Sequence, residues 1–444
     1  MPTHIDLLLA ADAVLTVDNE GTIVADGAVA VSDGRIVAIG QRDDISQRYA
    51  AVEVIEAPGC VVMPGWVNTH THLAMNVYRG TADDVTLEEF LDRLMGAELR
   101  ALSEDMVTVG VRAAIAECFA GGTTTALDMY WYPQAARAVA RETGFRLLNG
   151  PTFMGQVDPH GNDFEAMLGR AETILAENLA ESPDDALWVM PHSTYTLDAE
   201  QLGLIAELAG RFGARIHTHA CVSEGELALV EDLHGSRPIA VLAAAELLAP
   251  TTVLAHAVHL SDAEIRQISE VGATVAHCPI SNLKLGCGIA RVPELLAANV
   301  RVGLGTDGAA STGALNSVAT ARMAALLHKG TTRDPTTISA ERAVRLGTVE
   351  GARCLGLSDV GTVEVGMRAD LQVVRIATLS TAPTSDPWAA IVYGSSAADV
   401  RHTVVEGRVV MRDRVLQTID EATALADLQD SASQAAASTH QVRH

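Results

Sequence analysis

Two histidines, His70 and His72, follow a short apolar run and have the spacing of half a metal site. The run at 61–63 is typical of a buried strand. Because successive side chains of a strand alternate between its faces, the two imidazoles point the same way, about 7 Å apart. Neutral imidazoles are common ligands of divalent metals. A solvated loop would also tolerate a His-x-His pair, so the interpretation depends on the rest of the chain.

Other strand-like runs also end in residues that could bind a metal or transfer a proton. In a parallel barrel the carboxyl ends of all strands meet at one face, and active sites lie there. A random scatter would not place so many such residues at strand ends. The sequence therefore predicts one catalytic face, on which these residues gather: His70, His72, His192, His219, His256 and Asp307.

The elements that must position these residues alternate between strand and helix from about residue 61 onward. Helical patterns at 87–102, 105–120, 199–212 and 262–269 separate short apolar runs. Eight strand-then-helix units indicate an α/β fold of the (β/α)₈ TIM-barrel type. The eight expected strands lie at 61–63, 123–128, 145–148, 187–191, 215–219, 252–256, 273–277 and 300–305.

The two ends of the chain have a different pattern, with short strands and turns. Asp33-Gly34 between two apolar runs is a strong hairpin signal. We expect residues 1–60 and 361–420 to form one small β-sandwich beside a barrel at 61–360. The tail, 421–444, is expected to start as a helix and to fray from Ser431 onward.

Composition limits the classes of function. The chain has 444 residues and a formal charge of −25, which argues against nucleic-acid or anionic-membrane partners. Its six cysteines are scattered without metal or disulfide spacing, as in a reducing compartment. The N-terminal stretch carries acidic residues and no basic region, and no apolar run could span a bilayer. We therefore expect a cytoplasmic enzyme with a small-molecule substrate.

Five longer segments resemble the amidohydrolase superfamily, and most closely its branch of methylthioadenosine/S-adenosylhomocysteine deaminases and triazine hydrolases. The resemblance extends over most of the chain and implies a barrel with a split β-sandwich. It also implies a homo-oligomer. The segments are PGWVNTHTH (64–72), HSTYT (192–196), LAHAVHL (254–260), SNLKLGCGIARV (281–292) and GTDGAAS (305–311).

The resemblance also implies a role for each residue at the strand ends. His256 would hold a metal-activated water, and Asp307 would be both ligand and proton acceptor. His217 is expected to be a core histidine. Strand four contains no lysine that could bridge two metals, so one ion per chain is expected. That ion would be zinc, with Fe²⁺ as an alternative, and its ligands would be His70, His72, His219 and Asp307.

The sequence departs from its relatives after strand five. Deaminases of this branch carry a proton-donating glutamate three residues after the strand-five histidine, where this chain has Val222. Either the loop bulges so that Glu224 takes that role, which is what we expect, or the enzyme acts without such a glutamate. Glu226 is expected to begin a solvated helix.

The expected substrate contacts are His192, Glu98 and Trp131. Glu98 could equally lie on a solvated helix face, and Trp131 could equally be a packing residue. The arginines that these deaminases use after strand three are absent from 149–154, and Arg146 is a weak substitute. A substrate with an anionic tail is therefore not expected.

The leading hypothesis is a metal-dependent aminohydrolase that deaminates an amino-substituted N-heterocycle such as a purine, pterin or triazine. The alternative keeps the metal site but expels chloride, an alkylamine or an alkylthio group, or opens a cyclic amide. A third hypothesis is a barrel that binds a ligand without catalysis, which an intact ligand set disfavours. The Pro-Cys-x-x-Cys motif of cytidine deaminases is absent, which excludes that class.

Overall fold

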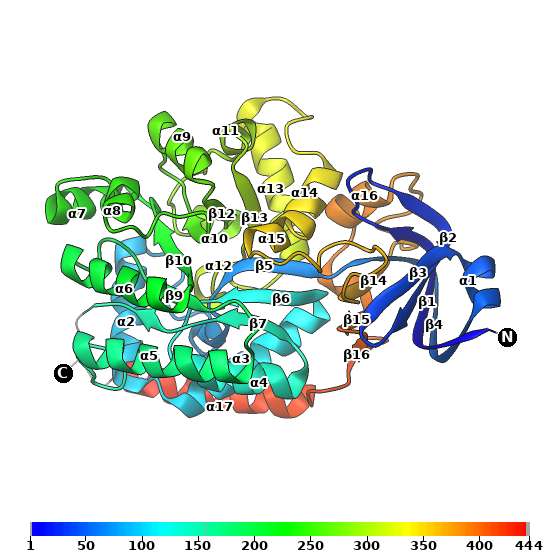
Figure 1. Ribbon diagram of the computed structural model, residues 1–444, viewed down its shortest axis with the longest axis horizontal. Coiled ribbons are helices and arrows are strands. Elements are labelled where there is room, and N and C mark those ends of the chain that lie inside the picture. Colours follow the sequence, from blue (N-terminus) through cyan, green and yellow to red (C-terminus); the bar gives the residue numbers. More distant parts are fainter. Residues whose placement is uncertain (1, 156, 441–444) are drawn as a thin grey trace.

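A computed structural model describes residues 2–155 and 157–440, and its centre is the predicted (β/α)₈ barrel (Figure 1). The barrel strands form two parallel sheets, with orders β5-β6-β7 and β8-β9-β10-β11-β12-β13. The Asp307 amide donates to the His70 carbonyl at 3.0 Å, which brings the segment after β13 beside β5. The strands are β5 (Trp66–Thr71), β6 (Thr123–Asp128), β7 (Arg146–Asn149), β8 (Thr152–Phe153), β9 (Trp188–Pro191), β10 (Arg215–Ala220), β11 (Thr252–His256), β12 (Thr274–His277) and β13 (Arg301–Leu304).

Helices follow the barrel strands and form its outer layer (Figure 1). Asp198 and Ser261 start two of these helices with complete capping boxes, so the sequence itself determines those ends. The helices of this region are η1 (Leu73–Tyr78), α2 (Leu87–Ala101), α3 (Glu104–Ala120), α4 (Pro133–Thr143), α5 (Phe164–Glu181), α6 (Ala199–Phe212), α7 (Glu224–His234), α8 (Pro238–Ala244), α9 (Asp262–Val271), α10 (Pro279–Lys284), α11 (Val292–Ala297), α12 (Ala309–Thr312), α13 (Ser317–Thr332), α14 (Ala340–Leu346) and α15 (Val349–Cys354).

Both chain ends share one eight-stranded mixed sheet with the order β17-β16-β15-β14-β4-β1-β2-β3, beside the barrel (Figure 1). The predicted hairpin turn lies at Asp33-Gly34, where both residues have positive φ, as a type I′ turn requires. Aliphatic side chains from both ends pack into one core on this sheet. Its elements are β1 (Thr3–Leu15), β2 (Ile23–Ser32), β3 (Arg35–Gln41), α1 (Arg42–Arg48), β4 (Tyr49–Pro64), β14 (Leu371–Arg375), β15 (Val400–Val405), β16 (Arg408–Arg412) and β17 (Val415–Leu416).

We expected the apolar run 61–63 to be the first barrel strand. In the structure it forms the end of β4. Met63 is paired with Gln372 of β14, while Val61 faces Ala13 of β1. The chain enters the barrel after Gly65, where a Cβ atom would lie 2.2 Å from the Thr124 side chain. An apolar run is expected in any strand that is buried on both faces. Its pattern therefore could not distinguish a barrel strand from a strand of the sheet formed by the chain ends. We propose that the sandwich extends to residue 64.

The tail is a continuous helix, α17 (Glu421–His440), so the prediction of fraying from Ser431 is wrong over this range. The helix packs against α2, α3 and η1 at the foot of the barrel in Figure 1. Ala424, Ser431 and Ala435 are buried in that contact. Tertiary packing therefore orders a segment whose composition alone was ambiguous; residues 441–444 lie outside the described part. Short turns at α16 (Pro387–Ala389), η2 (Ala390–Gly394) and η3 (Ala397–Asp399) complete the C-terminal region.

Across the described residues, no helix combines the length and the apolar character that crossing a membrane requires.

Candidate active site

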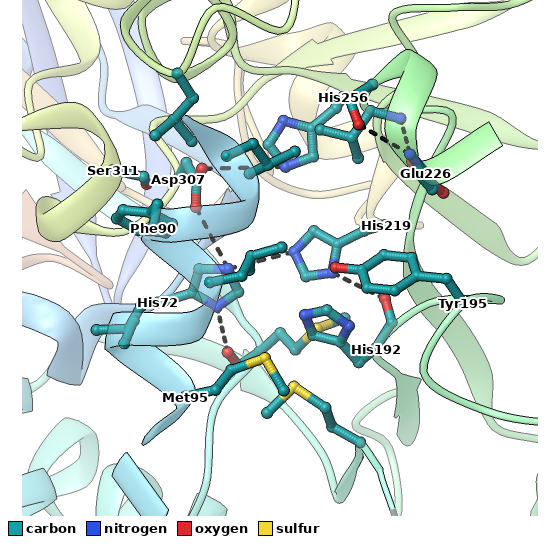
Figure 2. A pocket seen from close by; sticks show the side chains of 18 of the residues that line it. His72, Phe90, Met95, His192, Tyr195, His219, Glu226, His256, Asp307 and Ser311 are labelled. Atoms are coloured by element: carbon teal, nitrogen blue, oxygen red, sulfur yellow. Dashed lines mark hydrogen bonds and ion pairs between the residues drawn. The ribbon is translucent and has the colours of Figure 1, made fainter. Parts of the chain in front are cut away.

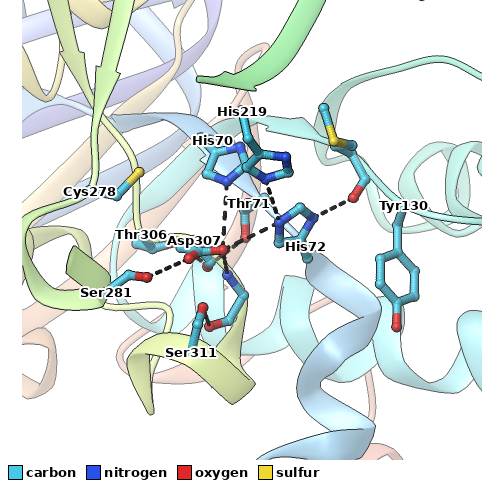
Figure 3. A network of polar contacts seen from close by, with 12 residues as sticks. His70, Thr71, His72, Tyr130, His219, Cys278, Ser281, Thr306, Asp307 and Ser311 are labelled. Atoms are coloured by element: carbon cyan, nitrogen blue, oxygen red, sulfur yellow. Dashed lines mark hydrogen bonds and ion pairs between the residues drawn. The ribbon is translucent and has the colours of Figure 1, made fainter. Parts of the chain in front are cut away.

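Three histidines and one aspartate meet at the carboxyl ends of the barrel strands (Figure 3). His70 lies in β5, His72 directly follows it, and His219 lies in β10; one ring nitrogen from each falls within 4.8 Å of the other two. Asp307 follows β13, and its Oδ1 lies 3.6 Å from His70 Nε2 and 3.3 Å from His72 Nε2. All four side chains are buried. The structure thus brings together the four residues that were predicted as ligands.

The hydrogen bonds of His72 and His219 determine which ring nitrogen faces the centre. His72 Nδ1 donates to the Met129 carbonyl, and His219 Nδ1 donates to the His192 carbonyl at 2.8 Å. In neutral rings the two Nε2 atoms therefore carry lone pairs, yet they lie only 3.3 Å apart. Two facing lone pairs repel each other, and a cation between them removes that repulsion.

His217 fixes the tautomer of His70. His217 Nδ1 donates to the Val253 carbonyl at 3.0 Å, so its Nε2 accepts from His70 Nδ1 at 2.8 Å. His70 Nε2 is left with a lone pair, buried and without a hydrogen-bond partner. An orphaned buried nitrogen beside a carboxylate and two other lone pairs fits a divalent metal ion. His217 is therefore a core residue, as predicted, with a positioning role that the sequence did not reveal.

The protonation states suit metal ligands. Burial lowers the pKa of His70 to about 3 and also lowers the pKa values of His72 and His219. Burial alone would raise the pKa of Asp307, but the neighbouring imidazoles outweigh it and hold that pKa well below its usual range. At neutral pH the site is three neutral imidazoles and one carboxylate, the donor set that zinc accepts.

His256 lies beside the cluster but is held differently. Its Nδ1 donates to Asn282 Oδ1 at 2.8 Å, and its Nε2 lies 4.0 Å from Asp307 Oδ2. That Asp307 oxygen also accepts from the Ser281 hydroxyl at 2.5 Å. Both His256 and Asp307 have a φ near +70°, a backbone strain that is often found at functional sites. The pair can hold and deprotonate a water molecule between them.

A pocket opens onto the cluster (Figure 2), and all three predicted substrate contacts, His192, Trp131 and Glu98, are among its lining residues. His192 and Trp131 lie on its wall, and Glu98 is only 3% exposed, which excludes a solvated helix face for it. Glu98 Oε1 accepts from the Tyr130 hydroxyl at 2.5 Å. Burial raises the pKa of Glu98 to about 7, so this carboxyl can be present in either protonation state near neutral pH.

Glu224 is not in the pocket, contrary to our expectation. It is the exposed first residue of α7, whereas Glu226 is buried and lines the pocket with Val222. The Glu226 carboxylate accepts hydrogen bonds from the backbone amides of Cys221 and Val222, and these two bonds stabilise the bend between β10 and α7. The expectation that Glu226 begins a solvated helix is wrong, because Glu226 is buried and α7 begins at Glu224. The sequence Ser223-x-x-Glu226, which has the capping-box signature of a helix start, could have indicated a position of Glu226 close to the loop. The bulge exists, with Cys221 at φ 55°, but it turns Glu226 inward.

Arg146 is also outside the site. It forms ion pairs with Asp370 at 2.9 Å and Glu406 at 3.0 Å, where the barrel meets the sheet of the chain ends. It therefore cannot contact a substrate at the strand ends.

Comparison with known proteins places these features in context. The profile of the amidohydrolase family matches residues 61–410, and that of a bacterial imidazolonepropionase-like composite domain matches 27–51. A 5-methylthioadenosine/S-adenosylhomocysteine deaminase of Syntrophobacter fumaroxidans is 38% identical over 94% of this chain and 95% of its own. A 5'-deoxyadenosine deaminase of Methanosarcina barkeri is 35% identical over 96% of this chain and 98% of its own.

Solved structures show the same fold. An adenosine deaminase of Xanthomonas campestris with bound zinc is 31% identical, with a TM-score of 0.94 over 98% of this chain and 100% of its own. An atrazine chlorohydrolase of Arthrobacter aurescens complexed with zinc has a TM-score of 0.87 over 96% of this chain and 100% of its own. At 22% identity, the second comparison concerns the fold alone.

Proposed function

Because this chain belongs to the amidohydrolase family, we propose that it is a metal-dependent aminohydrolase that removes the amino group of an N-heterocycle as ammonia. The observation that carries this proposal is the buried cluster of three imidazole lone pairs and one carboxylate at the floor of an apolar pocket. The three relatives at 31–38% identity support this reaction class, because each of them is named as a deaminase of an adenine nucleoside.

His70, His72, His219 and Asp307 would hold one divalent ion, zinc or Fe²⁺, because their free lone pairs converge and no Lys or Arg of the described residues lines the same pocket. When bound, such an ion acts as a Lewis acid and lowers the pKa of a water molecule toward neutrality. The chain's own residues would do the rest.

In the proposed reaction the water oxygen adds to the amino-bearing ring carbon and the carbon–nitrogen bond then breaks. Asp307 accepts one proton of the water through Oδ2. His256 Nε2, whose lone pair is free while Nδ1 donates to Asn282, takes up the second proton as the oxygen becomes the ring carbonyl, and the protonated ring stabilises the negative charge that develops there. The ring nitrogen and the departing ammonia must gain protons. Glu224 is exposed, and Glu226 uses its carboxylate on two backbone amides. We therefore assign proton delivery to Asp307 and His256.

Substrate contact is proposed for His192, Trp131 and Glu98, which all line the pocket. We also propose that the chain forms a homo-oligomer and acts in the cytoplasm. Six free, buried cysteines support a reducing compartment. Light scattering after gel filtration tests the oligomer.

A second candidate function keeps the metal site but expels chloride, an alkylamine or an alkylthio group, or opens a cyclic amide. The presence of Val222 in the pocket, with Glu224 outside it, favours the version of this alternative that expels chloride, because chloride is a poorly basic leaving group that departs without gaining a proton. The identities of the deaminase relatives favour the first candidate.

An ammonia-release screen of zinc-loaded protein tests the proposal. The substrates are adenine nucleosides, aminopterins and aminotriazines, with a chloro- and an alkylthio-triazine assayed for their own leaving groups. Asp307→Asn is the control, because it removes a ligand and the proton acceptor together. Release of ammonia that Asp307→Asn abolishes supports deamination. Release of chloride or thiol with no ammonia from any amine supports the second candidate.

A further inference from the structure

The pocket has a polar floor and an apolar wall. The floor is the cluster of His72, His219, His256 and Asp307. The wall comes from η1, α2 and α7, from the segments after β6 and β8, and from the residue after α10. Figure 2 draws Phe90 and Met95 of α2 among the residues that line the pocket together with these imidazoles. The empty space within the pocket is about 980 Å³ and includes space that is open to solvent. The apolar wall consists of Met75, Leu87, Phe90, Leu91, Leu94, Met95, Met129, Trp131, Met154, Leu229 and Leu285.

Every charged side chain beyond the floor carries the same sign. Glu88 at the rim, Glu98 and Glu226 line the pocket, and no Lys or Arg does so among residues 2–155 and 157–440. Beyond the floor, a carboxylate entering this space would lose its hydration and find acidic side chains but no Lys or Arg with which to pair.

Cations near the rim are already engaged. The Lys284 ammonium, next to the lining residue Leu285, is held by Asp83 Oδ1 at 2.6 Å and the Ala310 carbonyl at 3.0 Å. Arg93 on α2 pairs with Glu89 on the same helix. Neither side chain is available to accompany an anionic substrate.

Methionines at four points of the wall give it a particular chemistry. Their thioether sulfurs are polarizable and pack favourably on aromatic rings and on other sulfur or alkyl groups. Such a wall favours a substituent without charge.

We infer that the substrate is an uncharged N-heterocyclic amine with an apolar or thioether substituent, and that the pocket rejects the same heterocycle when its substituent ends in a carboxylate. This inference rests on the proposed function and names the substrate class of the same site. It separates two compounds that one relative's name joins, because methylthioadenosine is neutral whereas S-adenosylhomocysteine carries an amino-acid end.

The test compares kcat/KM for ammonia release from three compounds by the zinc-loaded full chain. They are 5′-methylthioadenosine, S-adenosylhomocysteine, and the N-acetyl methyl ester of S-adenosylhomocysteine, which has the long substituent without its charges. We expect the first and third to agree within about tenfold and the second to be about 100-fold poorer. A preference below tenfold for 5′-methylthioadenosine over S-adenosylhomocysteine would overturn the inference. Equal rejection of the neutral ester would do the same, since size would then be the cause.

A charge placed on the wall should reverse the selection. Met154→Arg should raise kcat/KM for S-adenosylhomocysteine at least tenfold relative to 5′-methylthioadenosine, whereas Met154→Gln, similar in length but uncharged, should not. Leu91→Arg on α2 repeats the test if the first variant fails to fold. Absence of this relative gain in a folded Arg variant would count against the inference.

Failure of the proposed function would look different. Zinc-loaded protein that releases no ammonia from any amine refutes the deaminase proposal, but calorimetric binding of the same three compounds still measures the selection. Equal Kd values for 5′-methylthioadenosine and S-adenosylhomocysteine would then overturn this inference, and a Kd ratio of tenfold or more would support it.

Discussion

Replacing His217 by leucine should weaken metal binding although His217 is not expected to touch the metal. His217 Nε2 is the acceptor that keeps the proton of His70 on Nδ1. Without it, the fully buried His70 either leaves an N–H unpaired or moves its proton to Nε2, where it blocks coordination. An unsatisfied buried donor costs about 1–3 kcal/mol. Since about 1.4 kcal/mol is tenfold, metal affinity should fall by about 10–100-fold, as is typical when such an outer hydrogen bond is lost.

The assay is a zinc titration against a competing chelator, which gives Kd independently of catalysis. A matched control is His328→Leu, because His328 is buried too but pairs with His277 Nε2 at 3.2 Å outside the cluster. That variant should lose stability and keep its zinc affinity. If His217→Leu bound zinc within about threefold of the wild type while folded, the relay from the Val253 carbonyl through His217 to His70 would have no role in the site.

Three further predictions concern the acid–base residues. His256→Asn should keep its zinc content while kcat falls about 100-fold or more, since a charge-stabilising group is lost; zinc loss measured by atomic absorption would instead make His256 a ligand. Glu224→Gln should leave turnover within about twofold of the wild type. Glu226→Gln should lower the free energy of unfolding by about 1–3 kcal/mol, because it weakens two buried hydrogen bonds to backbone amides. Activity and urea unfolding are measured for both variants, and a loss of turnover in Glu224→Gln with unchanged stability in Glu226→Gln would contradict this prediction. Burial raises the pKa of Glu98 from 4.5 to about 7, so the folded state binds the proton more tightly, and its contribution to stability is lost as pH rises from about 4.5 to 7. Glu98→Gln should therefore flatten the pH profile of unfolding by about 1–3 kcal/mol across that window, and an unchanged slope would show that Glu98 ionises normally.

The ligand residues could be predicted because strand ends constrain them strongly. A parallel barrel must bring the ends of β5, β10 and β13 to one face, so His70, His219 and Asp307 converge once the strands are assigned. Helix starts could also be predicted, because the capping signals at Asp198 and Ser261 lie within four consecutive residues of the sequence.

Loop geometry was much harder to predict from the sequence. Whether Glu224 or Glu226 turns inward depends on one positive φ at Cys221, which a non-glycine residue does not signal in advance. The role of His217 depends on the carbonyl of Val253 in a neighbouring strand. The run 61–63 was assigned to the wrong sheet because hydrophobicity reports burial, not the identity of the partner strand.

Joining the chain ends in one sheet has a consequence for the order in which the molecule can be completed. β4 borders β14 directly, with Pro64 opposite Leu371, so this edge stays unpaired until about 300 further residues have been synthesised. Contacts so distant in sequence close slowly, and an exposed apolar edge can meanwhile pair with another chain. We therefore expect chains that are truncated within the barrel to aggregate through β4. In the complete chain, pairing of the C-terminal strands with β4 covers this edge and should prevent that aggregation.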